Sequence, residues 1–205
     1  MDNMDNQPVS CEPVVPQKQP NSLIADLLDY IEIFVVAICV VIALFCFSGI
    51  RLCTVDGPSM ENTLQNQEQL ITSNLFYTPK RGDIVVFHQT SDNLGGYNKP
   101  IVKRVIGVAG DTVSIDYQTW TVTVTDKNGN VTVLDEPYRK VEDGNPYSSA
   151  PVSVYVEEGT VFVMGDNRNH SADSRHPGIG LVDTRRILGK VVLRITPFDR
   201  FGAVE

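Results

Sequence analysis

The sequence predicts an all-β domain preceded by one N-terminal transmembrane helix. Three observations lead to this fold class. Ile33–Phe47 is apolar and uncharged, Val-, Ile- and Thr-rich runs follow residue 51, and Gly-Asp or Asn-Gly pairs separate several of those runs. With 205 residues, 42% of them hydrophobic, the chain suits one globular domain and a short extra segment.

Residues 1–21 are predicted to form a disordered tail. They are rich in Pro, Gln, Asn and Asp and carry few large apolar side chains. Burial therefore cannot offset the entropy that ordering this segment would cost.

Residues 22–50 are predicted to form an amphipathic lead-in and a transmembrane helix. Asn21 and Ser22 are suitable helix caps, and Ile33–Phe47 extended through Ile50 approaches the length that crosses a bilayer core. A cleaved signal peptide is the alternative. It would begin with a basic region near Met1, whereas about thirty mostly acidic or polar residues precede this run.

Residues 51–205 are predicted to form the all-β domain, with a β-hairpin region inserted at about 112–160. Asn128-Gly129 between two Val/Thr-rich runs is typical of a hairpin turn. The predicted strands are Ile84–Phe87, Ile101–Ile106, Thr112–Ile115, Trp120–Thr125, Val131–Leu134, Val152–Val156, Val161–Met164 and Ile187–Ile195.

Charge and cysteine usage exclude several classes of protein. The net charge of −8, without any Lys/Arg-rich run, argues against a nucleic-acid partner. Cys11, Cys39, Cys46 and Cys53 lack the paired spacing of a zinc or redox site, and two of them lie in the apolar run. We expect no metal and no other cofactor.

Ser59 and Lys103 are the candidate catalytic residues. Ser59 lies in a turn-forming segment, Gly57-Pro58-Ser59-Met60, and Lys103 interrupts an otherwise apolar strand. A buried lysine can replace histidine as the base of a serine protease. Taken singly, each has an ordinary alternative: serines in turns are mostly structural, and lysines on strands are mostly solvated or protect an edge.

Several segments together resemble the bacterial type I signal peptidase family, from about Ile33 to Phe198. The resemblance rests on the N-terminal apolar helix and on four motifs. These are Gly57-Pro58-Ser59-Met60-Glu61-Asn62-Thr63-Leu64, Arg81-Gly82-Asp83-Ile84-Val85-Val86-Phe87, Lys103-Arg104-Val105-Ile106-Gly107-Val108-Ala109-Gly110-Asp111 and Met164-Gly165-Asp166-Asn167-Arg168-Asn169-His170-Ser171-Ala172-Asp173-Ser174-Arg175.

The resemblance implies a Ser–Lys endopeptidase on an all-β catalytic domain of the signal peptidase kind. Ser59 would attack the scissile carbonyl, Lys103 would remove its proton, and Ser171 would orient the lysine. Four charged residues match supporting positions: Asp166, Arg168, Asp173 and Arg175. Such a cluster ordinarily satisfies backbone groups and ion pairs; a metal site that includes His170 and His176 is the weaker alternative, because ligand spacing is lacking.

Two positions depart from the family pattern. Asn62 stands where the family usually has proline, so we expect a less rigid loop. Gly57 stands where some members supply a serine hydroxyl to the oxyanion, so the Ser59 backbone N–H must contribute more.

The resemblance also implies shallow apolar pockets for small side chains of the Ala-x-Ala type. For each apolar residue in the set, ordinary β-core packing is an equally good interpretation. The implied substrate-binding residues are Val55, Gly57, Met60, Leu64, Val86, Ile101 and Val102.

The implied partners are secreted preproteins, membrane lipid and, as a further candidate, the protein export translocon. The implied location is the bacterial cell membrane, with one span, a cytoplasmic N-terminus and the catalytic domain outside. Local charges favour the reverse orientation, since acidic residues precede the helix and Arg51 follows it. A self-cleaving repressor-type Ser–Lys peptidase and a membrane-tethered, non-enzymatic β-domain adaptor are the alternatives.

Overall fold

The computed structural model describes residues 23–47, 49–91, 97–142 and 152–204. Helix α1 spans Leu23–Phe47, with Asp26 in its first turn. The stretch Ala25–Leu44 within it has a mean hydropathy of 2.6 and is long and apolar enough to cross a membrane. The tail predicted at 1–21 lies outside the described residues.

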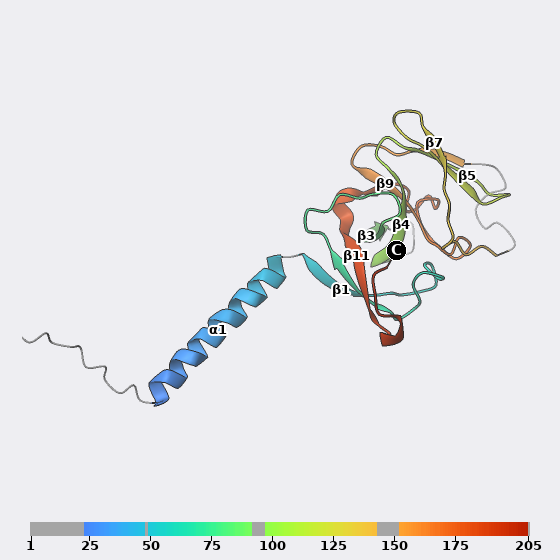
Figure 1. Cartoon of the computed structure of the whole chain (residues 1–205). Coiled ribbons are helices and arrows are strands. Elements are labelled where there is room, and N and C mark those ends of the chain that lie inside the picture. The colour runs from blue at the N-terminus through green and yellow to red at the C-terminus, as the bar shows by residue number, and fades with distance from the viewer. Residues whose placement is uncertain (1–22, 48, 92–96, 143–151, 205) are drawn as a thin grey trace, which may run out of the picture. The chain divides into compact units, whose positions relative to one another are not determined.

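A sheet of seven antiparallel strands forms the larger part of the β-domain, in the order β1-β2-β11-β3-β4-β9-β10 (Figure 1). The strands are β1 (Ile50–Thr54), β2 (Gln69–Ser73), β3 (Ile84–Ser91), β4 (Tyr97–Val108), β9 (Thr160–Met164), β10 (Val182–Asp183) and β11 (Ile187–Thr196). Short 3₁₀ helices η2 (Thr184–Arg186) and η3 (Phe198–Arg200) flank β11.

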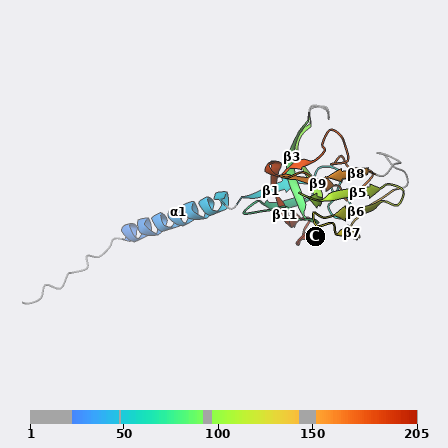
Figure 2. The same cartoon turned by 90° about the horizontal axis from the view of Figure 1, so that it is seen from above.

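A second, four-stranded sheet in the order β7-β6-β5-β8 comes from the segment between β4 and β9. Both views place it on the far side of β9 from β1 (Figures 1 and 2). Its strands are β5 (Thr112–Asp116), β6 (Thr121–Thr125), β7 (Val131–Val133) and β8 (Val152–Tyr155).

Alternating burial explains why these segments form strands. In β5 and β6 every second residue is buried, and these residues pack with Phe162 and Met164 of β9 in one apolar cluster. Strand β3 is buried on both faces: Val86 packs with Met60 in a second cluster, and Val85 with Val163 in a third. Buried clusters thus contain residues of β3, β4 and β9, the strands that carry or adjoin the motifs described above.

The predicted fold class, an all-β domain after one apolar helix, is confirmed. Strands β1, β2 and β10 were missing from the prediction. Strand β4 begins at Tyr97, earlier than the predicted Ile101. The domain limits at residues 21, 50 and about 112–160 stay a prediction.

Candidate active site

Ser59 lies in the loop between β1 and β2, on a turn whose flanks are anchored in the core. The Val55 N–H donates to the Glu68 carbonyl, and the Gln67 N–H donates to the Val55 carbonyl, both at 2.9 Å, closing the loop at its base. Met60, the next residue, is fully buried, whereas Ser59 remains partly exposed. The local sequence therefore fixes the backbone and leaves the hydroxyl accessible.

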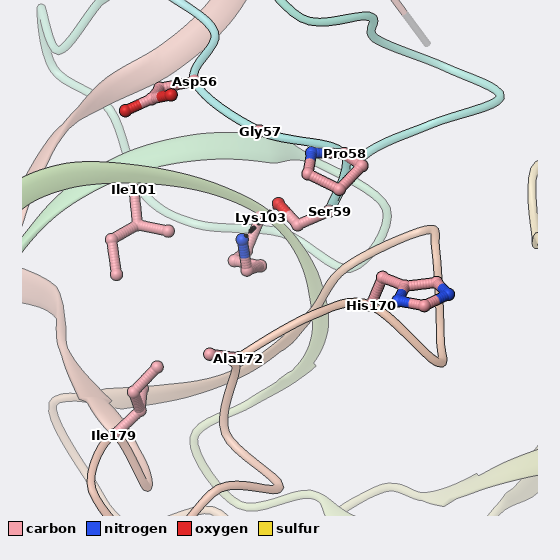
Figure 3. Close-up of a pocket in the computed structure, with 9 residues that line it drawn as sticks. All are labelled: Asp56, Gly57, Pro58, Ser59, Ile101, Lys103, His170, Ala172 and Ile179. Carbon is pink, nitrogen blue, oxygen red and sulfur yellow. Dashed lines mark hydrogen bonds between the residues drawn. The ribbon is translucent and has the colours of Figure 1, made fainter. Parts of the chain in front are cut away.

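Lys103 lies in β4 with its side chain only 1% exposed. Its Nζ is 2.7 Å from the Oγ of Ser59 and 2.8 Å from the carbonyl oxygen of Val102. Figure 3 shows the two side chains pointing toward one another from the loop and from the strand. The structure thus brings together two residues that are 44 positions apart in the sequence.

Burial lowers the pKa of Lys103 from its ordinary value of 10.5 to about 8. The loss of hydration penalises the ammonium form most. Asp173 and Asp166 oppose the shift, and Arg175 adds to it. A lysine with this pKa is partly neutral near neutral pH, so its amine can accept a proton from the bonded serine.

Asp173 holds together the segment 164–175, which forms one wall of the site beside the Ser59–Lys103 pair. It is fully buried and accepts hydrogen bonds from the Ser171 hydroxyl at 2.7 Å and from the Gly165 N–H at 2.9 Å. The Arg175 guanidinium donates to both of its oxygens, at 2.8 and 2.7 Å. Although burial raises the pKa of Asp173, Arg175 and these hydrogen bonds outweigh it and hold the pKa below its usual value.

The other two supporting residues belong to two further buried ion pairs. Asp166 accepts hydrogen bonds from Arg104 Nε and Nη2, both at 2.9 Å, and from the Thr63 hydroxyl at 2.5 Å. Arg168 donates to both oxygens of Glu136, at 2.9 and 2.6 Å. All four side chains of these pairs are at most 3% exposed.

Gly165 marks the closest approach between the wall and the Ser59 loop. A Cβ atom there would lie 2.2 Å from the Ser171 Oγ and 2.4 Å from the Ser59 carbonyl oxygen. Asn167, two residues further along the same segment, also contacts the Ser59 loop. Its backbone N–H donates to the Ser59 carbonyl oxygen at 3.1 Å. Only glycine permits this contact, so the Gly165 position sets the distance between Ser171 and Ser59.

A pocket of about 400 Å³ opens beside Ser59 and Lys103 (Figure 3). Of the seven predicted substrate-binding residues, Gly57 and Ile101 line it. The other five lie in the apolar core beneath it, where at most 9% of each residue is exposed: Val55, Met60, Leu64, Val86 and Val102.

Five lining residues were absent from the sequence-based set: Asp56, Pro58, His170, Ala172 and Ile179. Asp56 and Pro58 flank Gly57, and Ala172 lies between Ser171 and Asp173, so proximity to the motifs was an available signal. The sequence held no such signal for Ile179, because this residue lies outside the motifs and reaches the pocket only through the fold of the loop after Arg175. Glu136, the partner of Arg168, was also missed.

Asn62 adopts a left-handed backbone conformation, with φ of 83°. Its side-chain amide donates to the Tyr138 carbonyl at 3.4 Å, and the Lys140 ammonium lies 2.8 Å from Glu61 Oε2. These contacts tie the Ser59 loop to the segment that follows β7. The loop is therefore cross-linked at the position where the sequence predicted less rigidity.

The histidines near the wall have local partners. His170 bonds Glu142 at 3.0 Å, and His176 Nδ1 accepts from the Gly178 N–H at 3.0 Å. In the part of the chain that the structure describes, no group of three or more His, Cys, Asp or Glu residues could hold a metal ion.

Comparison with known proteins gives consistent matches over most of the chain. Residues 27–196 match the family described as signal peptidase, peptidase S26. Signal peptidase I of Bacillus caldolyticus is 36% identical over 82% of this chain and 90% of its own length. Signal peptidase I of Bacillus amyloliquefaciens is 33% identical over 89% and 95%. Signal peptidase IB of Staphylococcus aureus is 34% identical over 72% and 78%. By the extent of these matches, the chain belongs to the signal peptidase family, peptidase S26.

Proposed function

We propose that this chain is a membrane-anchored endopeptidase that removes N-terminal signal peptides from secreted preproteins, with Ser59 as nucleophile and Lys103 as general base. The single observation that carries the mechanism is the 2.7 Å contact between Ser59 Oγ and a buried Lys103 amine. Membership of the signal peptidase family supports the choice of substrate.

In the proposed reaction Ser59 Oγ attacks the carbonyl carbon of the scissile bond and its proton passes to Lys103 Nζ. The resulting ammonium donates this proton to the leaving amine, and an acyl-enzyme ester on Ser59 remains. Lys103, neutral again, then takes a proton from the water molecule that attacks the ester carbonyl, and returns this proton to Ser59 Oγ as the carboxylic acid product leaves. The Val102 carbonyl, 2.8 Å from Nζ, helps to hold the amine toward Ser59 throughout.

The backbone N–H of Ser59 is the proposed oxyanion donor. The Gly57 N–H is occupied, since it donates to Asn66 Oδ1 at 3.0 Å. By contrast, the Ser59 N–H has no acceptor among the described residues. A donor that is already fixed in place stabilises the developing charge without reorganisation.

The substrate is proposed to bind in an extended conformation along β4. Pairing of β4 with β9 begins at Arg104, so the preceding residues of β4 have no strand on that side within the described chain. An extended peptide can add to such an edge by main-chain hydrogen bonds. The pocket walls there include Ile101, Ala172 and Ile179, which suits small apolar side chains of the Ala-x-Ala type.

Ser171, Asp173 and Arg175 are proposed to position Lys103 rather than to react. The Ser171 hydroxyl donates to Asp173, which Arg175 holds as a carboxylate. Asp166 and Arg168 are proposed to fix the backbone of the same segment through their ion pairs with Arg104 and Glu136.

The helix is proposed to span the cell membrane once, with the N-terminus cytoplasmic and the β-domain outside, where signal peptides emerge. Lipid contact by the β-domain itself is also proposed. Large exposed apolar side chains lie on the edge strand β1 and in the segments that follow β2 and β11: Leu52, Leu75, Phe76, Phe198 and Phe201. Exposed apolar side chains of this kind suit the membrane surface at which the cut is made.

The decisive experiment is cleavage of a synthetic Ala-x-Ala peptide by the full chain in detergent, compared with its Ser59→Ala variant. We expect cleavage by the native chain and none by the variant, with unchanged thermal unfolding. Equal cleavage by both would exclude Ser59 as nucleophile. Absence of cleavage by the native chain on peptides and on intact preproteins would favour the non-enzymatic adaptor.

Orientation is tested separately by protease treatment of intact protoplasts that express the chain. The β-domain should be degraded while a cytoplasmic marker protein survives. Protection of the β-domain under these conditions would reverse the proposed orientation.

A further inference from the structure

One side chain at the rim of the pocket differs in character from the rest. Of the nine residues that line it, Asp56 is the one with a carboxylate, three positions before Ser59. In the view of Figure 3, Asp56 and Ile101 lie on one side of the Ser59–Lys103 pair, and His170 lies on the other side. A substrate side chain that enters the pocket from the Asp56 side therefore meets a negative group.

Asp56 is held much less firmly than the acidic residues of the wall. Its side chain is 70% exposed, and its ion-pair partner Lys99, at 3.4 Å, is 60% exposed. Asp173, in comparison, is fully buried and accepts hydrogen bonds from three residues. An exposed lysine–carboxylate pair contributes little and exchanges partners readily. Asp56 can thus turn from Lys99 to a cation on a bound peptide.

Lys99 lies on the part of β4 where the substrate is proposed to bind. Side chains two apart on a strand share a face, so Lys99, Ile101 and Lys103 form a row that leads to Ser59. The Asp56–Lys99 contact crosses from the Ser59 loop to the start of this row. A peptide that extends along this row of β4 therefore lies beside the Asp56–Lys99 pair.

We propose that Asp56 makes this peptidase favour substrates with a basic side chain, and disfavour those with an acidic one, at one position beside the cut. The proposal rests on the proposed peptidase function and adds a charge preference to it. Lys99 acts as an internal competitor, because it supplies the cation that the substrate would otherwise supply. The net charge of −8 favours basic peptides in the same direction, though without selecting a position.

The test uses the full chain in detergent and peptides that differ at a single position. Lys, Ala or Glu is placed in turn at each of several positions around the cut, and kcat/KM is measured for each peptide. At one position the native chain should cleave the Lys peptide about twofold to fivefold faster than the Glu peptide. This ratio should approach one in high salt, because exposed charges are screened.

Two substitutions should move the ratio in opposite directions. Asp56→Asn should lower the ratio of kcat/KM for the Lys peptide to kcat/KM for the Glu peptide to one or below. The Lys99 ammonium then faces the substrate without the Asp56 carboxylate beside it. Lys99→Gln should raise the ratio further. Glu158→Gln removes one negative charge from the exposed turn before β9 and should leave the ratio at the native value.

The outcomes separate this inference from the proposed function. If the native chain cleaves the Ala peptide but Asp56→Asn has the native ratio at every position, the charge preference is wrong and the peptidase function stands. If Glu158→Gln lowers the ratio as much as Asp56→Asn, only net charge matters and the proposal is again overturned. If the native chain cleaves none of the peptides, the peptidase function itself fails.

Discussion

Lys103 and Arg104 are neighbours on β4, and their positive groups lie on opposite faces of the strand. Both side chains are almost fully buried. Arg104 meets Asp166 through two hydrogen bonds of 2.9 Å and stacks 3.8 Å from the Tyr138 ring centroid. Lys103 has only the neutral oxygens of Ser59 and Val102 within hydrogen-bond distance in the described chain.

The difference shows how one strand supplies both a structural cation and the proposed base. A buried charge next to a carboxylate is retained, whereas a buried charge without one favours the neutral form. Arg104 fastens β4 to the Asp166 segment. The adjacent Lys103 has its pKa lowered to about 8, and the same strand holds it against Ser59.

The largest expected effect comes from replacing the proposed base, Lys103, with another cationic residue. Lys103→Arg should lower kcat/KM on an Ala-x-Ala peptide by about 10²–10⁴-fold, because a guanidinium does not deprotonate in the working range. Lys127→Arg, in an exposed turn of the second sheet, is the matched control and should retain native activity. A near-native rate for Lys103→Arg or for Lys103→Ala would refute the Ser–Lys mechanism.

The second prediction compares the two neighbours by stability. Arg104→Met should lower the free energy of unfolding by about 3–5 kcal/mol, because it leaves Asp166 buried without its cation. Lys103→Met should leave stability unchanged or raise it, since it removes a desolvated amine. Urea unfolding followed by fluorescence of the one tryptophan, Trp120 in the core, measures both. Equal destabilisation by the two substitutions would contradict the comparison.

The third prediction concerns pH. Since the pKa of Lys103 falls from 10.5 to about 8 on folding, the unfolded chain binds a proton that the folded chain lacks between these values. Native stability should therefore rise with pH across this window, by about 3 kcal/mol relative to Lys103→Met. Below about pH 8 the two proteins should show parallel pH dependence.

The cleavage rate should follow the same pKa. Below about pH 8 it should rise about tenfold per pH unit and then level off, because only the neutral amine accepts the serine proton. A rate that is flat between pH 6 and 8 would show that Lys103 is not the titrating base.

The smallest effects are expected from the histidines. His88→Gln, His170→Gln and His176→Gln should each change kcat/KM by less than about fivefold, since none of these side chains bonds Ser59 or Lys103. Steady-state assays on the three variants provide the measurement. A loss comparable to that of Lys103→Arg in any folded histidine variant would indicate a histidine base instead.

Much of the fold could be predicted from periodicity, and the failures have physical reasons. The alternating Val/Thr runs of β5 and β6 were recognised because each buries one apolar face. Strand β2 turns Leu70 and Thr72 inward, and a buried threonine hides the apolar pattern. Strand β1 is short, lies at the sheet edge and has no fully buried residue, so it gives almost no signal.

The candidate catalytic pair was predicted through family resemblance, and the structure places the two side chains in contact. The hydrogen-bond partners of the supporting residues were harder to predict, because these contacts depend on how distant segments are arranged in space. Arg168 bonds Glu136, which is 32 positions away in an irregular segment. The predicted substrate-binding set includes both pocket-lining and core residues for a similar reason, since Ile101 and Val102 are equally apolar but face opposite sides of β4.

The left-handed conformation of Asn62 limits which residues from related proteins can be introduced at this position. Proline, which the family usually has here, is confined to φ near −65°, whereas Asn62 has φ of 83°. Restoring the family residue would therefore conflict with the turn and break the contact to Tyr138. Such a dependence of one substitution on its background is epistasis: proline becomes acceptable at this position only after the surrounding loop has been rebuilt.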